Sequence, residues 1–125
     1  MLTNSKAFSG FAVDDLDKAR RFYGDILGLA TSDGPETSLL TLHLAGGRDT
    51  IVYEKPGFTP ATYTILNFPV DDVGEAVDAL TAKGVHFERY QGFDQDDKGV
   101  ARGQGPDIAW FKDPAGNILS VLKVS

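Results

Sequence analysis

Few side chains in this chain could carry out acid–base chemistry or metal binding. It has two histidines, His43 and His86, and no cysteine, which excludes disulfides, thiolate metal sites and cysteine nucleophiles. His43 alternates with leucines over residues 40–44 and can serve as a general base or as a hydrogen-bond donor to a ligand. The alternative is a histidine hydrogen-bonded within a polar lining or at a sheet edge. His86 follows Gly84 at a strand start and is interpreted as a surface residue.

Aromatic and amide side chains are the next candidates. Trp110 can stack on an aromatic or cationic ligand, or it can be a core residue, and Tyr53 and Tyr90 carry the same two alternatives. Asn67 is an amide within an otherwise apolar run. If it faces inward it needs a hydrogen-bond partner, which a ligand, a neighbouring side chain or a water molecule can supply.

The glycine-rich segment 91–105 is predicted to be a long loop, and long loops often carry function. It is interpreted either as a flexible segment or as a lid whose Arg102 meets an anionic ligand. The acidic residues 94–97 lack the spacing of an EF-hand calcium loop, and no Gly-Lys-Ser/Thr run opens a helix as in a phosphate-binding loop.

An internal repeat indicates which elements position these side chains. The run from Phe11 to Leu16 resembles the run from Phe68 to Val73, and the two lie 57 positions apart. Alternating or apolar runs predict strands at 6–13, 29–33, 38–44 and 50–55 in the first half, and at 62–70, 85–90, 106–111 and 117–124 in the second.

Between the first two strands of each half, apolar residues recur at helical spacing. The first helix is predicted from Leu16 to Leu27, capped by Asp14 or Asp15 and stopped by Gly28; the second follows Asp72, with Glu75 completing a capping box, and stops at Gly84. Each half therefore reads as a βαβββ module, with module 1 at about 5–55, a linker at 56–61 and module 2 at about 62–124. We expect these modules to form a single α+β domain.

The repeat and its motifs resemble the vicinal oxygen chelate superfamily, which includes glyoxalase I, extradiol dioxygenases and bleomycin-resistance proteins. The matching residues are Val13-Asp14-Asp15-Leu16, Lys18-Ala19, Phe22-Tyr23, Leu27-Gly28-Leu29 and Asp113-Pro114-Ala115-Gly116-Asn117. The resemblance implies two modules forming a curved mixed sheet around a cavity, with helices on the outside. It also implies a small-molecule ligand and a homodimer.

Many members of that superfamily bind a divalent metal through His, His and Glu on the inner strands. The resemblance places these positions on Phe8, Ile65 and Ser120, and a further ligand position falls near residues 51–53. None of these residues is a histidine or a carboxylate, and a register slip of one residue does not supply one. We therefore expect no metal and no other cofactor.

If the resemblance holds, strand alternation selects the side chains that face the cavity. The predicted inward sets are Phe8, Gly10 and Ala12, then Ile65, Asn67 and Pro69, then Ile118, Ser120 and Leu122. His43 is expected to face inward, with Trp110 as its counterpart when each is counted back from the glycine-containing turn of its half. The predicted ligand-binding residues are Phe8, His43, Tyr53, Ile65, Asn67, Arg102, Trp110 and Ser120.

Composition limits the classes of partner. The 125-residue chain is 42% hydrophobic, typical of a globular domain, and its formal net charge of −6 disfavours nucleic acid. No run is long and apolar enough for a membrane span, residues 1–6 open no secretory h-region, and the lack of cysteine fits a cytoplasmic location. We therefore expect a metal-free binding protein for an apolar or aromatic small molecule. The alternative is a lyase or dioxygenase-type enzyme that uses His43 or an unusual metal site.

Overall fold

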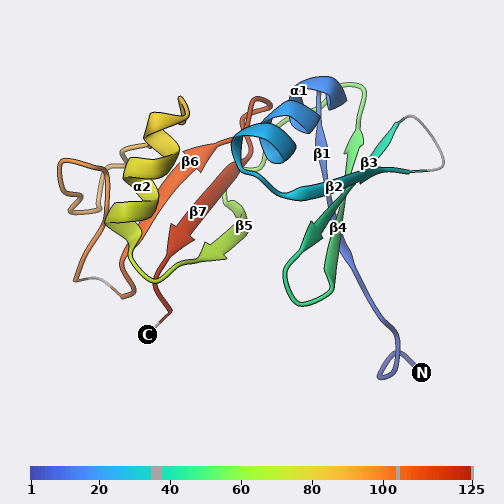
Figure 1. Cartoon of the computed structure of the whole chain (residues 1–125), viewed down its shortest axis with the longest axis horizontal. Helices are drawn as coiled ribbons and strands as arrows, with labels where there is room; N and C mark the ends of the chain where they lie inside the picture. Colours follow the sequence, from blue (N-terminus) through green and yellow to red (C-terminus); the bar gives the residue numbers. More distant parts are fainter. Residues whose placement is uncertain (35–37, 104, 125) are drawn as a thin grey trace. The chain divides into compact units, whose positions relative to one another are not determined.

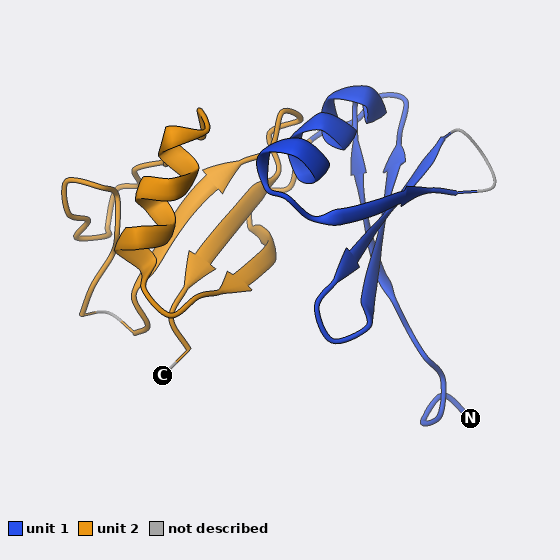
Figure 2. Cartoon of the chain, viewed as in Figure 1, with its two compact units in different colours: residues 1–59 blue, residues 60–125 orange. Residues whose placement is uncertain are grey.

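The structure is a computed structural model of the whole chain, and it describes residues 1–34, 38–103 and 105–124. The chain divides into two compact units, unit 1 with residues 1–59 and unit 2 with residues 60–125 (Figure 2). Each unit contains its own sheet, and each is described by itself below.

Unit 1 has a four-stranded mixed sheet (Figure 1). The strands lie in the order β1-β4-β3-β2, with β1 parallel to β4 and the other neighbours antiparallel. The elements are β1 (Ser9–Val13), α1 (Leu16–Arg20), η1 (Arg21–Ile26), β2 (Ala30–Asp33), β3 (Leu39–Leu44) and β4 (Arg48–Glu54).

The helical segment of unit 1 begins as predicted but does not stay α-helical. The Asp15 carboxylate caps it by accepting from the Lys18 amide at 3.1 Å. From Arg21 onward the segment is a π-helix, η1, whose last turn closes with the Leu27 amide on the Phe22 carbonyl. The wider turn buries Phe22 and Tyr23 together, and the Tyr23 ring contacts both Phe22 and Phe11.

Unit 2 repeats the plan with a three-stranded mixed sheet in the order β5-β7-β6, where β5 is parallel to β7. The elements are β5 (Thr64–Pro69), α2 (Val73–Ala82), β6 (Ile108–Lys112) and β7 (Ile118–Leu122). The Asp72 carboxylate caps α2 by accepting from the Glu75 amide at 3.0 Å, at the position that the sequence predicts.

One predicted strand of unit 2 is wrong. Residues 85–90 do not form a ladder, and only an isolated bridge joins Phe87 to Phe111, beside one backbone hydrogen bond from Glu88 to Trp110. The side chains of Val85 and Phe87 are nevertheless buried, so the segment packs on the sheet edge without continuing it. The apolar alternation that predicted a strand reflects this packing.

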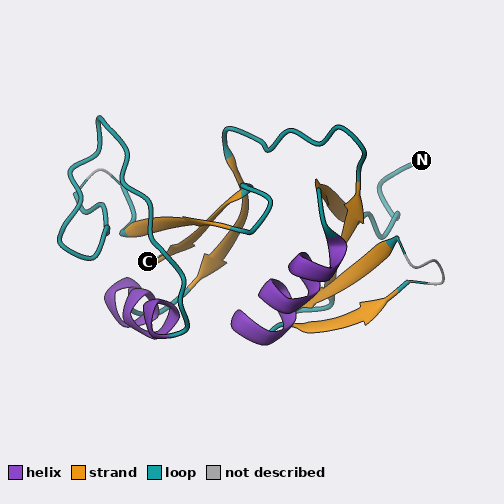
Figure 3. Cartoon of the chain, turned by 90° about the horizontal axis from the view of Figure 1, so that it is seen from above, coloured by secondary structure: helices purple, strands orange, loops and turns teal. Residues whose placement is uncertain are grey.

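In each unit the helix covers one face of the sheet: α1 packs on β3 and β4, and α2 packs on β6 and β7 (Figure 3). The core of unit 1 therefore contains Val13, Leu40, Leu42 and Val52, and that of unit 2 contains Val77, Ala109, Phe111, Leu119 and Val121. The other sheet face of each unit carries the alternate residues of the strands.

This architecture confirms the predicted α+β class, and in each unit a helix covers one face of the sheet. The described residues form two mixed sheets, one per unit, where we expected one continuous curved sheet. No helix among the described residues is long and apolar enough to cross a membrane.

A candidate ligand-binding pocket

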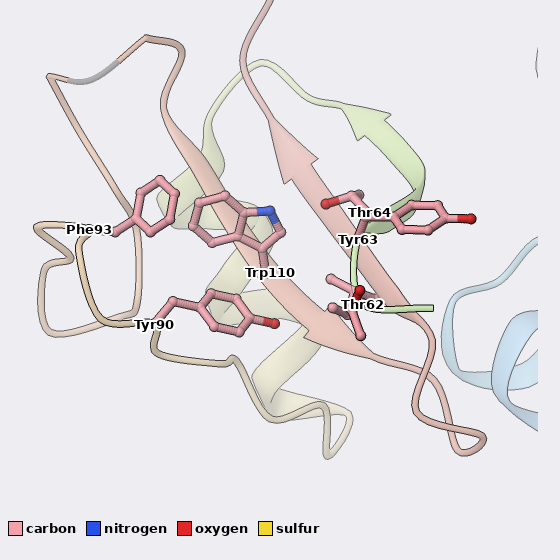
Figure 4. Close-up of a pocket in the computed structure, with 7 residues that line it drawn as sticks. Thr62, Tyr63, Thr64, Tyr90, Phe93 and Trp110 are labelled. Atoms are coloured by element: carbon pink, nitrogen blue, oxygen red, sulfur yellow. The ribbon is translucent and has the colours of Figure 1, made fainter. Parts of the chain in front are cut away.

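Unit 2 carries a pocket of about 380 Å³ on the sheet face that α2 leaves open. This volume lies in the range that small-molecule sites occupy. Its walls come from the start of β5, the loop between α2 and β6, and both strands of the β6–β7 pair (Figure 4). The lining residues are Thr62, Tyr63, Thr64, Tyr90, Phe93, Trp110 and Ile118.

Three aromatic rings form the centre of this pocket. The Trp110 indole lies 5.6 Å from the Tyr90 ring at 74° and 4.9 Å from the Phe93 ring at 59°. In the view of Figure 4 the Phe93 ring lies to the left of the indole, the Tyr90 ring lies below it, and the Thr64 and Tyr63 side chains lie to the right. Phe93 keeps 47% of its surface exposed, so apolar ring area remains accessible to a ligand.

The loop that supplies Tyr90 and Phe93 is held at its base by two side chains. The Arg89 guanidinium donates to the carbonyls of Asp96 at 2.7 Å and Asp97 at 2.8 Å. The Gln95 amide accepts from the Tyr90 amide at 2.8 Å and donates to the carbonyls of Glu88 at 3.0 Å and Gly99 at 2.7 Å. A single residue thus satisfies three backbone groups that no strand partner serves. These bonds brace the base of the region that the sequence interprets either as a flexible segment or as a lid.

A second set of bonds fixes the other half of the loop. The Asp96 carboxylate accepts from the amides of Lys98 and Val100, both at 2.9 Å, and Val100 is fully buried. Burial raises the pKa of this carboxyl, but the two amides and the Arg102 guanidinium outweigh that effect and leave the pKa below its ordinary value.

Arg102, predicted to meet an anionic ligand, has partners inside the loop. Its guanidinium donates to Asp96 at 3.3 Å and to Asp107 at 2.7 Å. These carboxylates occupy donors that an anionic ligand would require, and Arg102 is absent from the lining of the pocket.

The hydroxyl of Tyr90 is buried and, among the described residues, has no hydrogen-bond partner. Burial raises the pKa of this phenol, and the nearby Glu88 carboxylate adds to the shift. An unpaired buried hydroxyl costs about 1–3 kcal/mol. The wall of the pocket therefore holds a polar group that a bound molecule could pair.

A β-bulge changes which residue of β5 lines the pocket. The register against β7 shifts between Thr64 and Leu66, so Thr64 lies opposite Ile118 and Ile65 is the extra residue. Thr64, and not the predicted Ile65, contributes to the lining. The strict alternation used in the sequence prediction fails at this position because it assumes an uninterrupted ladder.

Asn67, Ser120 and Trp110 lie in one row across β5, β7 and β6. The Ser120 hydroxyl donates to the Asn67 amide oxygen at 2.6 Å, and Ser120 is fully buried. The partner that Asn67 requires is therefore a neighbouring side chain, as one of the predicted alternatives states. Within unit 2 the structure brings these three predicted residues together.

The remaining predicted residues, Phe8, His43 and Tyr53, belong to unit 1. Tyr53 faces away from α1, opposite Leu39 and Ala12, and is 40% exposed. Phe8 precedes β1 and is 66% exposed. His43 bonds to Ser32 at 2.7 Å and to Asp49 at 3.0 Å, two residues that the sequence interpretation did not single out.

The predicted equivalence of His43 and Trp110 is wrong by two residues. Trp110 lies opposite Ser120, which takes the place that Ile51 has in unit 1, and Ile51 lies opposite Thr41. The counterpart of Trp110 is thus Thr41, and that of His43 is Lys112. Counting back from the turns fails because the turn between β6 and β7 is longer than the turn between β3 and β4.

The positions implied for metal ligands do not fit a metal. Phe8, Ile65 and Ser120 supply no imidazole or carboxylate, and the Ser120 hydroxyl already donates to Asn67. Among residues 1–34, 38–103 and 105–124, no group of three or more His, Cys, Asp or Glu side chains could hold a metal ion.

Comparisons with known proteins agree on the fold. One similar structure is TnmS3, an antibiotic binding protein from Streptomyces sp. CB03234, with a TM-score of 0.73 and 22% identity, covering 98% of this chain and 99% of that one. Lactoylglutathione lyase from Agrobacterium tumefaciens has a TM-score of 0.69 and 22% identity, and the match covers 98% of this chain and 96% of that one. A putative glyoxalase family protein from Bacillus anthracis has a TM-score of 0.71 and 19% identity, and the match covers 98% of both chains. A search of curated protein sequences finds no match.

The architecture, with one mixed sheet and one covering helical segment in each unit, is thus that of the glyoxalase-like proteins. The family model of the Glyoxalase/Bleomycin resistance protein/Dioxygenase superfamily matches residues 7–121, and the chain belongs to this superfamily. This confirms the resemblance read from the Val13–Leu16 and Asp113–Asn117 motifs.

Sequence reasoning missed part of the pocket. Thr62, Tyr63 and Phe93 were not singled out, and Tyr90 was considered without being selected. The available signal was the close spacing of Tyr90 and Phe93 in a segment that precedes the strand of Trp110. That signal is weak, because the two rings reach the indole through a loop whose hydrogen bonds the sequence does not reveal.

Proposed function

We propose that this protein binds a planar aromatic or apolar small molecule, without a catalytic metal, in the pocket of unit 2. The observation that carries the proposal is the Trp110 ring with Tyr90 and Phe93 packed against it inside an open pocket. Rigid aromatic side chains supply large contact area at low entropic cost, which suits recognition of a flat apolar ligand.

The polar groups of the pocket support a ligand with a hydrogen-bonding substituent. The hydroxyls of Thr62 and Thr64 lie in the wall, and the buried Tyr90 hydroxyl lacks a partner among the described residues. An apolar lining with a few polar groups is the usual composition of a small-ligand site. A phenol, quinone or heteroaromatic compound fits this pattern better than a pure hydrocarbon.

The superfamily membership supports the same class of function. TnmS3, which shares the fold, is an antibiotic binding protein, whereas lactoylglutathione lyase shows that the fold also serves enzymes. The binding alternative is favoured here because the positions implied for the metal hold Phe8, Ile65 and Ser120. Since fold alone does not determine function, the residues of the site carry the choice.

The test uses the intrinsic fluorescence of Trp110, the only tryptophan of the chain. Planar aromatic compounds that carry a hydroxyl or carbonyl group are titrated into the protein, beside saturated ring compounds of equal size. We expect saturable quenching by the planar compounds, with Kd in the range of about 1–100 μM, and about tenfold weaker binding by Phe93→Ala. Absence of quenching by every planar compound, or equal binding by Phe93→Ala, would contradict the proposal.

Metal dependence is measured in parallel. Protein purified without a histidine tag is analysed for bound metals and is scanned for thermal stabilisation by Zn, Ni, Mn, Fe and Mg ions. We expect less than stoichiometric metal and no shift of the unfolding temperature. One metal per chain with a clear stabilisation would favour the enzymatic alternative.

The proposal extends to assembly and location. We expect a homodimer that works in the cytoplasm, since relatives of this fold often dimerise and a chain without cysteine suits a reducing compartment. Light scattering during size-exclusion chromatography tests the first point, and fractionation of the source cells tests the second.

A further inference from the structure

Three polar side chains form a hydrogen-bonded row on the open sheet face of unit 1. The His43 Nε2 atom lies 2.7 Å from the Ser32 hydroxyl, and its Nδ1 atom lies 3.0 Å from an oxygen of Asp49. The three residues come from neighbouring strands β2, β3 and β4. His43 lies directly opposite Asp49 in the ladder, and Ser32 lies on β2 opposite Thr41, two pairs from the Ala30–His43 pair and on the same face.

The identity of the partners determines the tautomer of a neutral His43. An ionised carboxylate can only accept hydrogen bonds, so Nδ1 carries the proton and donates it to Asp49. Nε2 then has a free lone pair and accepts from the Ser32 hydroxyl. The Ser32 hydroxyl therefore donates to one imidazole nitrogen, while the other nitrogen of the same ring donates to the Asp49 carboxylate.

This connectivity is that of an activated nucleophile, its general base and an orienting acid. The row is open to solvent: Ser32 is exposed, and the side chains of His43 and Asp49 are 43% and 51% exposed. β2 is an edge strand of its sheet, so one flank of Ser32 has no neighbouring strand. A small acyl donor can reach the hydroxyl without any movement of unit 1.

We propose that Ser32 is a nucleophile that accepts acyl groups from activated esters, with His43 as general base and Asp49 as a positioning residue. The Ser32 oxygen attacks the acyl carbon while its proton passes to His43 Nε2. The tetrahedral intermediate expels the alcohol or phenol oxygen, which takes that proton, and an acyl-serine remains. Water, deprotonated by the same imidazole, then releases the carboxylic acid and restores the serine.

The exposure of the row limits the rate. General-base assistance contributes about 10²–10⁴-fold, but a solvated site lacks the dry, preoriented surroundings that stabilise the oxyanion. We therefore expect fast acylation relative to deacylation, and a burst of one product per chain followed by slow turnover. This inference goes beyond the proposed function and rests on unit 1, so each can fail without the other.

The experiment follows p-nitrophenol release from p-nitrophenyl acetate by the full chain, with peptide mass spectrometry to locate the acetyl group. We expect acetylation of Ser32, loss of the burst in Ser32→Ala, and acylation about 10²-fold slower in His43→Gln. Asp49→Ala should slow acylation about tenfold, with partial rescue in Asp49→Glu. Ser9→Ala is the matched control, since the Ser9 hydroxyl pairs with Thr50 and not with an imidazole, and it should behave as wild type.

A cysteine replacement gives an independent measurement, because the chain has no cysteine of its own. Ser32→Cys should react with iodoacetamide at least about tenfold faster than Ser9→Cys, and His43→Gln should remove the difference, since the imidazole favours the thiolate. Acetyl groups found only on His43 or on lysines, a burst that survives Ser32→Ala, or equal alkylation of the two cysteine variants would overturn the proposal.

Discussion

Unit 1 and unit 2 share the order strand, helix, then antiparallel hairpin, but unit 1 has one strand more, and the two units place different chemistry on the sheet face that the helix leaves open. In unit 1 that face carries the Ser32–His43–Asp49 row and the half-exposed ring of Tyr53. In unit 2 the corresponding strands carry Trp110, Ser120 and Ile118, and a braced loop replaces the strand that β2 provides in unit 1. Replacing one edge strand by a loop is what allows two extra rings to reach the sheet.

The largest expected effect on ligand affinity tests whether ligand binding is confined to unit 2. Trp110→Leu removes the central ring of the pocket, and we expect affinity for a planar aromatic ligand to fall by at least about 30-fold, near 2 kcal/mol. Calorimetry measures this loss without relying on tryptophan emission. Phe8→Ala in unit 1 is the matched truncation and should change affinity less than about twofold; an equal loss would show that unit 1 contributes to the site.

The two hairpin turns provide the next comparison. Asp113, 4% exposed, accepts from the Ala115 amide at 3.0 Å, the Asn117 amide at 2.8 Å and the Asn117 side chain at 3.1 Å. Asp113→Ala removes these three bonds from a largely buried turn, and we expect a loss of about 2–4 kcal/mol in the free energy of unfolding. The measurement is urea denaturation.

The control lies in the corresponding turn of unit 1, which is exposed. Ala45→Ser there should change stability by less than about 0.5 kcal/mol. If both substitutions cost the same, the buried carboxylate does not stabilise unit 2 in the way described.

In the loop between α2 and β6, the contribution of Asp96 to stability is expected to depend on pH. Because the pKa of Asp96 is lowered in the folded protein, its ionised carboxylate adds to the free energy of unfolding above the ordinary aspartate pKa, near pH 4. This contribution is lost as the pH falls through the lowered pKa. Asp96→Ala should therefore cost about 1–2 kcal/mol at pH 7 and less at an acidic pH below the ordinary aspartate pKa. Urea denaturation at the two pH values measures this, and a cost independent of pH would contradict it. Asp94→Ala, in the exposed tip of the same loop, is the control and should be neutral.

The smallest effect concerns the Tyr90 hydroxyl. Tyr90→Phe removes a buried group without a described partner, so we expect the free protein to be unchanged or more stable by up to about 1 kcal/mol. A ligand that pairs the hydroxyl should bind this variant about 3–10-fold more weakly. Tyr53→Phe, in unit 1, should change neither quantity. A less stable free Tyr90→Phe would mean that the hydroxyl has a partner after all.

Much of the fold could be predicted from local chemistry. Asp15 and Asp72 cap their helices where the sequence places them, because the cap depends on residues within one turn. The strands near Leu40–Leu44 and Ile118–Leu122 follow from alternation. The edge segment 85–90 could not be distinguished from a strand, since burial of Val85 and Phe87 gives the same pattern whether or not the backbone forms a ladder.

The site was less predictable because it depends on pairings between distant residues. Trp110 was selected from its type, but the bulge that brings Thr64 to the pocket in place of Ile65 is a property of the β5–β7 register. The Ser32–His43–Asp49 row likewise requires the β2–β3 and β3–β4 registers together. A single sequence shows the residues of such a row but not which of them lie opposite one another.

The three hydrogen bonds of the Gln95 amide, called here the Gln95 clamp, affect which residues of this loop can be substituted without loss of the fold. Residues 91–94 are exposed and lie between Tyr90 and Gln95. The bond between these two residues closes the segment at its base, and the Gln95 amide makes two further bonds to the backbone. Because the clamp closes beneath them, their length and side chains can vary while the scaffold keeps its hydrogen bonds. Phe93 stands in this segment and contacts Trp110, so a descendant or a designer can alter ligand preference there at little cost to folding.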